Sequence, residues 1–161
     1  MRRLQKTIEE TGWTTGVPKF GKQDMVARAF DAMSREAHDC VLILEGEGLA
    51  GIFTTRDFLN RVAAVRRDPQ TLALGEVMTP VPRTLRPRDP VAFAINWMAV
   101  EGFRNVPITD DGGKVLGVLT IWDVMRHLGD VFDEIDATPR PTSPKGDISD
   151  VINMVDLGGG G

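Results

Sequence analysis

The feature that most constrains the fold is an internal repeat. Residues Gly51–Asp57 and Gly117–Asp123 share a Gly, two apolar residues, a Thr and an Asp at identical spacing. The similarity extends upstream with an offset of 65, as from Asp24 to Asp89, and the offset becomes 66 after the Asp-Asp-Gly-Gly turn at 110–113. One added turn residue explains this change. A period above about 50 residues is too long for small solenoid repeats and indicates two copies of one compact supersecondary unit.

Both copies predict the same order of secondary-structure elements. Apolar residues recur at helical spacing from Met25, with Asp24 placed to cap the helix, and again from Val91 in the second copy. Each helix is followed by two short apolar strands around a Gly-containing acidic turn, which is a hairpin signal, and then by a second helix. A short leading strand at 17–20 or 83–85 completes each copy. The predicted unit is therefore α/β (α+β): strand, helix, strand, strand, helix.

The expected organisation of the chain follows from the two copies. The segment from 66 to 82 carries polar and Pro residues and joins them. The acidic, Pro-rich stretch at 133–146 is typical of a flexible linker, and the apolar spacing at 148–155 predicts a short amphipathic helix. The chain divides into an N-terminal helical extension at 1–14, a first repeat at 15–68, a second repeat at 69–131, and an acidic Pro- and Gly-rich tail with the amphipathic segment at 132–161.

Composition and charge narrow the function classes. The formal net charge of −4 and the pI near 5.2 give no electrostatic reason to expect a nucleic-acid partner. Cys40 is the single cysteine and cannot form an internal disulfide, which suits a reducing compartment. No apolar run approaches the roughly 20 residues that span a bilayer, and the N-terminus does not resemble a signal peptide. We therefore expect a cytoplasmic protein with neither membrane nor nucleic acid as partner.

The Thr-x-x-Asp motif at each strand-to-helix junction has two interpretations. It has the spacing of a capping box, with Thr54 or Thr120 as N-cap and Asp57 or Asp123 reaching back to the cap. The same geometry suits a nucleotide, because a helix N-terminus attracts phosphate and a carboxylate in the first turn can accept both ribose hydroxyls. Capping boxes favour Glu or Gln over the shorter Asp that both copies carry. The motif therefore also supports a ligand-binding role.

The motifs of both copies resemble a known family. The second copy contains VMTP at 77–80, RTLRPRDPV at 83–91, GFRNVPITD at 102–110 and GVLTIWD at 117–123, a series that looks like a cystathionine-β-synthase (CBS) domain. Residues 17–66 resemble a first such domain, so the chain resembles a tandem CBS pair, or Bateman module. This resemblance implies two repeats packed sheet against sheet about a pseudo-twofold axis. It also implies two clefts that bind adenine nucleotides or other adenosyl ligands.

The resemblance assigns ligand-binding roles to residues of both copies. It implies that Asp57 and Asp123 are the ribose-binding carboxylates and that Thr54 and Thr120 are the hydroxyls on the phosphate side. The strand before each hairpin lines the implied base pocket, and the leading strands contribute as well. The positions implied in this way are Arg104, Asn105, Val106 and Pro107 in the second copy, Asp39, Cys40, Val41 and Leu42 in the first, and Thr84 and Lys19 on the leading strands.

Two residues depart from the family pattern, which has a second hydroxyl just before the Asp. Arg56 stands at this position in the first copy and can pair with a phosphate. Trp122 stands there in the second copy and is too bulky for that role, so it can fill, line or block the second cleft. The two clefts are therefore expected to be unequal, with Asp57 more important than Asp123 for binding a phosphorylated adenosine.

The sequence contains no evident catalytic or metal site. His38 and His127 have no partners at metal-ligand spacing, and Cys40 is expected to be buried in packing. We predict a non-enzymatic sensor that requires no cofactor, binds AMP, ADP, ATP or another adenosyl compound, and alters an unknown regulated target or its own assembly. The resemblance implies that the protein is a homodimer. The alternative is a constitutive dimerisation scaffold with vestigial clefts. A third interpretation, an enzyme that uses the adenosyl ligand, lacks a catalytic constellation.

Overall fold

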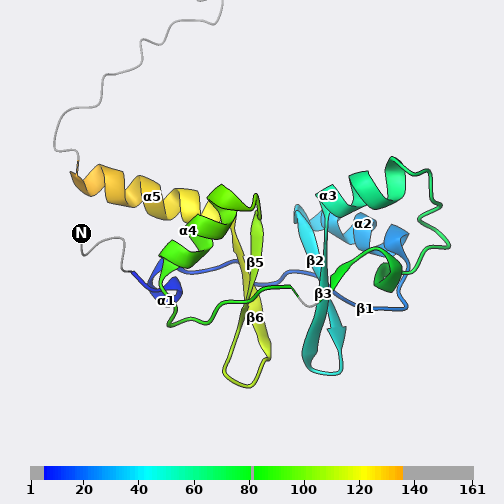
Figure 1. The fold of residues 1–161 in the computed structure, drawn as a ribbon, viewed down its shortest axis with the longest axis horizontal. Helices are drawn as coiled ribbons and strands as arrows, with labels where there is room; N and C mark the ends of the chain where they lie inside the picture. The colour runs from blue at the N-terminus through cyan, green and yellow to red at the C-terminus, as the bar shows by residue number, and fades with distance from the viewer. Residues whose placement is uncertain (1–5, 81, 136–161) are drawn as a thin grey trace, which may run out of the picture.

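Two similar α/β units face each other through their sheets, and helices cover the outer sides (Figure 1). This computed structural model describes residues 6–80 and 82–135. The strands are β1 (Lys19–Gly21), β2 (Cys40–Glu45), β3 (Gly48–Thr54) and β4 (Thr79–Pro80) in the first unit, and β5 (Asn105–Thr109) and β6 (Val115–Thr120) in the second. The first sheet has the order β1-β2-β3-β4, with β1 parallel to β2 and the other neighbours antiparallel. The second sheet is the antiparallel pair β5-β6.

Helices flank each sheet on the side away from the other unit. Those of the first unit are α2 (Val26–Glu36), α3 (Thr55–Phe58) with its π-helical continuation η2 (Leu59–Ala63), and the short 3-10 helix η3 (Leu74–Glu76). Beside the second unit lie α1 (Ile8–Thr11), α4 (Val91–Val100) and α5 (Ile121–Ile135). In the described part of the chain, no helix combines the length and the apolar character needed to cross a bilayer.

The structure confirms the repeat and relates the two units by a pseudo-twofold axis. Both hairpins, β2-β3 and β5-β6, shift register at equivalent points, which are Ile43/Leu44 and Ile108/Thr109. The predicted order strand, helix, strand, strand, helix is present in the first unit. In the second unit the leading strand is reduced to a single parallel bridge between Leu85 and Ile108. The duplication therefore extends to backbone irregularities as well as to the order of elements.

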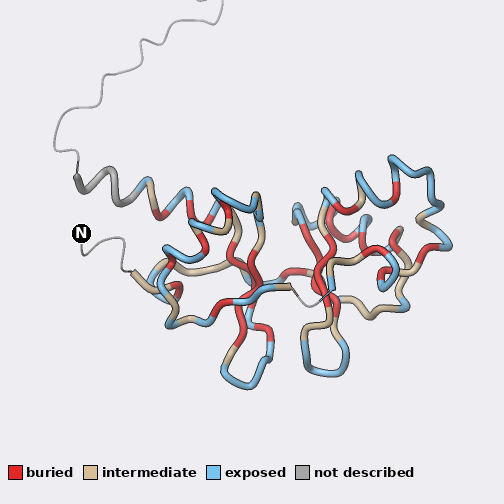
Figure 2. Tube along the Cα trace, viewed as in Figure 1, coloured by how far each residue is buried: buried red, intermediate tan, exposed pale blue. Residues whose placement is uncertain are grey.

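Alternate residues of the hairpins point to opposite sides and build separate cores. In β2, Val41 and Ile43 pack against the helices of the first unit, whereas Cys40 and Leu42 point toward the second unit. Figure 2 shows many of the buried residues in the two facing sheets. The core between the units consists of Val17, Cys40, Leu42, Ile52, Val115 and Val118. Because this core draws on both repeats, it holds their sheets face to face and fixes the walls of any site between them.

The segment that precedes each repeat packs on the other repeat. Ile8 of α1 is fully buried in the core of the second unit. Thr14 exchanges two backbone hydrogen bonds with Val118 of β6, at 2.9 and 3.0 Å. In the same way, β4 pairs with β3 of the first unit. The buried residues just before β4 are Leu72, Leu74 and Val77, which pack in the first core although the sequence analysis begins the second repeat at residue 69.

Two local expectations differ from the structure. Asp24 does not cap α2, because the N-cap is Met25, which makes no side-chain capping bond. The Asp24 carboxylate instead accepts a hydrogen bond from the N–H of Gly21 at 2.8 Å and so closes the turn that leads into the helix. At the other end, α5 continues to Ile135, beyond the expected start of the linker at residue 133. The amphipathic segment expected at 148–155 lies outside the described residues.

Candidate functional site

A cavity of about 670 Å³ lies between the two units. This volume falls within the range of small-molecule sites, about 300–1,000 Å³. The cavity is bounded by the junction of β3 and α3, by the segment that follows β4, and by the loop that leads into β5. The lining residues are Asp39, Ile52, Thr54, Thr55, Arg56, Asp57, Leu59 and Arg61 from the first unit, Thr79, Pro80, Pro82 and Arg83 from the connecting segment, and Trp97, Gly102, Phe103, Arg104, Asn105 and Val106 from the second unit.

Asp57 uses one carboxylate oxygen for the helix cap. The backbone N–H and the hydroxyl of Thr54 both donate to Oδ2 of Asp57 at 2.9 Å, and the Asp57 N–H donates back to the Thr54 hydroxyl. The second oxygen, Oδ1, lies 3.4 Å from both the Thr79 hydroxyl and the Arg61 guanidinium. These distances are long for charge-assisted hydrogen bonds, which are usually 2.7–2.9 Å. Oδ1 therefore retains the capacity to accept a further hydrogen bond.

Asp123 is held more tightly. The N–H and the hydroxyl of Thr120 donate to Oδ2 of Asp123 at 2.8 Å, as in the first copy. The Thr14 hydroxyl lies 3.0 Å from Oδ2 and 3.3 Å from Oδ1, and Arg126 pairs with Oδ1. Both oxygens are thus engaged within the protein, and Asp123 does not line the 670 Å³ cavity. The capping interpretation holds in both copies, but only Asp57 combines the cap with a place at the cavity.

Four arginines and two aspartates give the cavity an excess of two positive charges. Arg61 is fixed by hydrogen bonds to the carbonyls of Val77 and Met78, each 2.8 Å long. Arg83 pairs with Glu101, and its guanidinium lies over two aromatic rings of the second unit. Arg56 and Arg104 make no ion pair and no side-chain hydrogen bond with another described residue. These two guanidiniums are therefore the uncommitted cations of the cavity.

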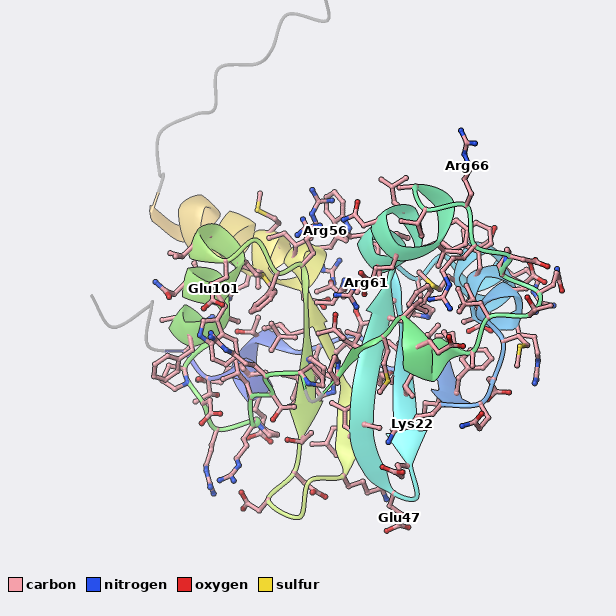
Figure 3. All side chains as sticks on the ribbon, turned by 45° about the vertical axis from the view of Figure 1, so that its right-hand side comes forward. Lys22, Glu47, Arg56, Arg61, Arg66 and Glu101 are labelled. Carbon is pink, nitrogen blue, oxygen red and sulfur yellow. The ribbon has the colours of Figure 1, made fainter. Side chains whose placement is uncertain are left out.

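The positions of the labelled side chains agree with this description. Figure 3 shows Arg56 and Arg61 in the space between the two units, toward the end of the module that carries α3 and α5. Another part of the cavity lining is apolar and includes Ile52, Pro80 and Pro82, whereas the side chain of Val106 packs in the core of the second unit. Asn105 also lines the cavity, and its amide can both donate and accept hydrogen bonds. The cavity lining thus combines apolar residues, a carboxylate and cationic side chains.

Seven of the residues that the sequence analysis selected as ligand-binding line the cavity. They are Asp39, Thr54, Arg56, Asp57, Arg104, Asn105 and Val106. Thr120 and Asp123 form the second Thr-x-x-Asp junction instead. Pro107 is buried in β5, and Cys40 is buried in the core between the units. Lys19 and Thr84 are exposed and do not line the cavity.

Sequence reasoning missed the residues that reach the site from the crossing segments, which are the segments that precede each repeat and pack on the other repeat. Thr14 and Thr79 each donate a hydroxyl hydrogen bond to the motif carboxylate of the unit onto which they cross. The offset of 65 relates these two threonines and could have identified them. Arg83 also enters the cavity from a crossing segment. The sequence analysis gave it no role, because the motif alone does not show which side of the module that segment reaches.

The remaining reactive side chains lie outside this cavity. Burial raises the pKa of the Cys40 thiol to about 12, and the neighbouring Asp39 carboxylate adds to the effect. The thiol therefore stays protonated at neutral pH and is a poor nucleophile. Within the described residues, no group of three or more His, Cys, Asp or Glu side chains has the geometry of a metal site.

A family model for the CBS domain matches residues 14–64 and 74–130. The chain belongs to the CBS-domain family. Among curated proteins, it is 30% identical over 114 residues to the meiotically up-regulated gene 70 protein of Schizosaccharomyces pombe, across 71% of this chain and 15% of that protein. The chain spans about half or less of the length of the curated relatives that it matches.

Solved structures show the same tandem arrangement. The crystal structure of the CBS domain NE2398 is 26% identical, with a TM-score of 0.68 over 79% of this chain and 98% of that chain. A CBS domain protein from Pyrobaculum aerophilum, complexed with AMP, is 18% identical with a TM-score of 0.69 over 80% of this chain and 99% of that chain. Together with the two family matches, these similarities identify the fold as a CBS pair.

Proposed function

We propose that this CBS pair is a non-catalytic sensor that binds an adenine nucleotide in the cavity at Asp57. The observation that carries the proposal is the weakly engaged Oδ1 of Asp57, which lies at a cavity lined by apolar residues and cationic side chains. A carboxylate oxygen of this kind can accept a hydrogen bond from a ribose hydroxyl. The apolar residues can hold the base, and the guanidiniums can bind phosphate. The sensor acts by changing the state of a partner protein or of its own assembly.

Two further observations support this proposal. The protein from Pyrobaculum aerophilum with the same fold is complexed with AMP, which favours an adenosyl ligand for this module as well. Both oxygens of Asp123 are already engaged by Thr14, Thr120 and Arg126. A ligand at Asp123 must therefore displace protein contacts that a ligand at Asp57 does not. We expect one nucleotide per chain, bound at Asp57.

A thermal-shift screen tests the proposal. The ligands are AMP, ADP, ATP, NAD and S-adenosylmethionine at millimolar concentration, with guanosine and cytidine nucleotides as controls. Ligand at 100 times its Kd adds about 2.7 kcal/mol to the free energy of unfolding. For a chain of this size that corresponds to a rise in Tm of roughly 5–11 °C. No shift with any adenosyl ligand would support the constitutive dimerisation scaffold instead.

Matched substitutions in the two motifs locate the site. Asp57→Asn and Asp123→Asn keep the size of the side chain and an oxygen for the cap, and each removes one charge. Because a hydrogen bond to a charged group contributes about 1.5–3 kcal/mol, Asp57→Asn should weaken binding about tenfold or more in calorimetric titration. Asp123→Asn should retain the affinity and the stoichiometry of the unmodified protein. The reverse pattern would place the working site at Asp123.

We propose further that two chains associate through the end of the module that carries α3 and α5. Leu59, Trp122 and Met125 are 62%, 63% and 55% exposed, and both helices lie at this end (Figure 1). A second copy would remove these apolar side chains from water. Sedimentation velocity should show a dimer that Trp122→Glu weakens. Phe93→Glu is the control, because Phe93 is also exposed but lies on α4. A monomer at all concentrations would contradict this assembly.

A further inference from the structure

The residues that line the cavity at Asp57 differ in charge from the residues at the equivalent positions of the other repeat. The repeat offsets of 65 and 66 assign every lining residue a counterpart in the other repeat. Three cavity arginines have counterparts with no fixed charge: Trp122 for Arg56, His127 for Arg61, and Pro18 for Arg83. The fourth, Arg104, has Asp39 as its counterpart, and both of these line the cavity. The cavity therefore carries four arginines against two aspartates, whereas the counterpart positions carry one arginine against two aspartates.

The two uncommitted arginines come from different repeats. Arg56 belongs to α3 in the first unit, and its guanidinium lies 3.7 Å from the position that a Cβ would take on Gly102 of the second unit. Gly102 stands two residues before Arg104 in the loop that leads into β5. Arg56 therefore reaches across the opening between the units to the loop that carries Arg104. A ligand that binds both side chains must contact both repeats.

We propose that the cavity recognises the phosphate chain of a nucleoside di- or triphosphate through Arg56 and Arg104. The inference rests on the proposed function, because it takes the ribose and the base to occupy the cavity at Asp57. A guanidinium pairs with one phosphoryl group through two parallel hydrogen bonds. A chain of two or three phosphoryl groups offers each guanidinium its own pair of oxygens, whereas both guanidiniums must share the three free oxygens of a single phosphate.

The same charge argument separates classes of adenosyl ligand. The excess of two positive charges on the lining residues attracts a polyphosphate and repels a cationic sulfonium such as that of S-adenosylmethionine. Arg61 and Arg83 add to the field, although their strongest contacts are already made within the protein. Adenosine, which has no phosphate, gains nothing from these four side chains. Affinity is thus expected to increase with the length of the phosphate chain.

Calorimetric titration with adenosine, AMP, ADP, ATP, GTP and inorganic tripolyphosphate tests this inference. We expect ADP and ATP to bind at least tenfold more tightly than AMP. Arg56→Gln and Arg104→Gln should each weaken ATP binding about tenfold or more and should change adenosine binding less than twofold. Arg66→Gln is the matched control, because Arg66 is exposed and points away from the space between the units (Figure 3). Added salt should weaken the binding of ATP more than that of adenosine.

The outcomes distinguish this inference from the proposed function. Equal affinities for AMP and ATP, or unchanged ATP binding by both glutamine variants, would overturn the phosphate-chain inference and leave adenosyl binding intact. If tripolyphosphate and GTP bind as tightly as ATP and lose affinity in both variants, the inference holds and the adenosine specificity fails. If none of the six compounds binds, both are overturned.

Discussion

The N-terminal segment that crosses to the second unit depends on a glycine at its point of contact. A Cβ on Gly117 of β6 would lie 2.5 Å from the carbonyl oxygen of Thr14 and 2.5 Å from Cδ1 of Trp13. The carbonyl belongs to the backbone, so a flexible side chain cannot relieve the clash. Gly51 occupies the equivalent contact in the first unit, where a Cβ would lie 2.9 Å from the carbonyl oxygen of Thr79. We therefore predict that Gly117→Ala detaches the segment around Thr14.

The expected loss of stability follows from the contacts at this point. Overpacking a filled site costs about 1–3 kcal/mol. The two backbone hydrogen bonds between Thr14 and Val118 contribute about 0.5–1.5 kcal/mol each, and moving the segment breaks them. Replacing Gly by Ala also restricts the unfolded chain, which offsets roughly 0.4–1 kcal/mol. The free energy of unfolding should therefore decrease by about 1–5.6 kcal/mol, which lowers Tm by roughly 2–22 °C.

Urea unfolding followed by circular dichroism measures this change. Gly129→Ala is the control, because Gly129 lies in α5, is exposed, and has no neighbour within 4 Å of an added Cβ. Alanine in an exposed helix should raise stability by up to about 1 kcal/mol, so the two variants are expected to change stability in opposite directions. A Gly117→Ala protein within 0.5 kcal/mol of the unmodified one would refute the contact between the segment and β6.

Two other predictions concern buried polar groups. Because burial raises the pKa of Cys40 to about 12, the unfolded chain releases this proton first. Stability should decrease as pH rises above about 9, by roughly 1.4 kcal/mol per pH unit, and urea unfolding of Cys40→Ala should lack this slope. The Thr14 hydroxyl lies 3.0 Å from the Asp123 carboxylate, and the Thr79 hydroxyl lies 3.4 Å from the Asp57 carboxylate. Thr14→Val should therefore destabilise the protein more than Thr79→Val, by about 1 kcal/mol. Equal losses would contradict the tighter hold on Asp123.

The parts of the fold that the sequence predicts are those that local chemistry determines. The hairpins follow from short apolar runs around Gly-containing turns, and the two capping boxes follow from Thr and Asp at fixed spacing. The repeat strengthens each of these assignments, because a pattern found twice at one offset is unlikely to arise from local composition alone. Asp24 shows the limit of this approach, since a shift of one residue separates a helix cap from a turn.

The local sequence patterns could not predict where the crossing segments pack. Ile8 and Leu74 are fully buried, yet each lies in a helix of three or four residues that is too short for an apolar period to appear. Their partners are set by the topology, because the segment with Ile8 leads to the bridge between Thr14 and Val118 of β6, and the segment with Leu74 leads to the pairing of β4 with β3. The cavity depends on the same topology. Arg83 reaches it from a crossing segment, and its distance in sequence from Asp57 gives no indication of their proximity.

The two repeats agree where the backbone requires a residue and differ at the positions of the four arginines that line the cavity. Gly51 and Gly117 are both required by a close backbone contact, and the Asp of each motif holds the first turn of a helix. Arg56 and Trp122 occupy equivalent positions, and both are exposed, so packing of the fold does not require either one. A change that folding does not explain, at a position beside a ligand-sized cavity, points to selection on binding. The difference between Arg56 and Trp122 therefore agrees with the proposal of a single nucleotide site per chain, at Asp57.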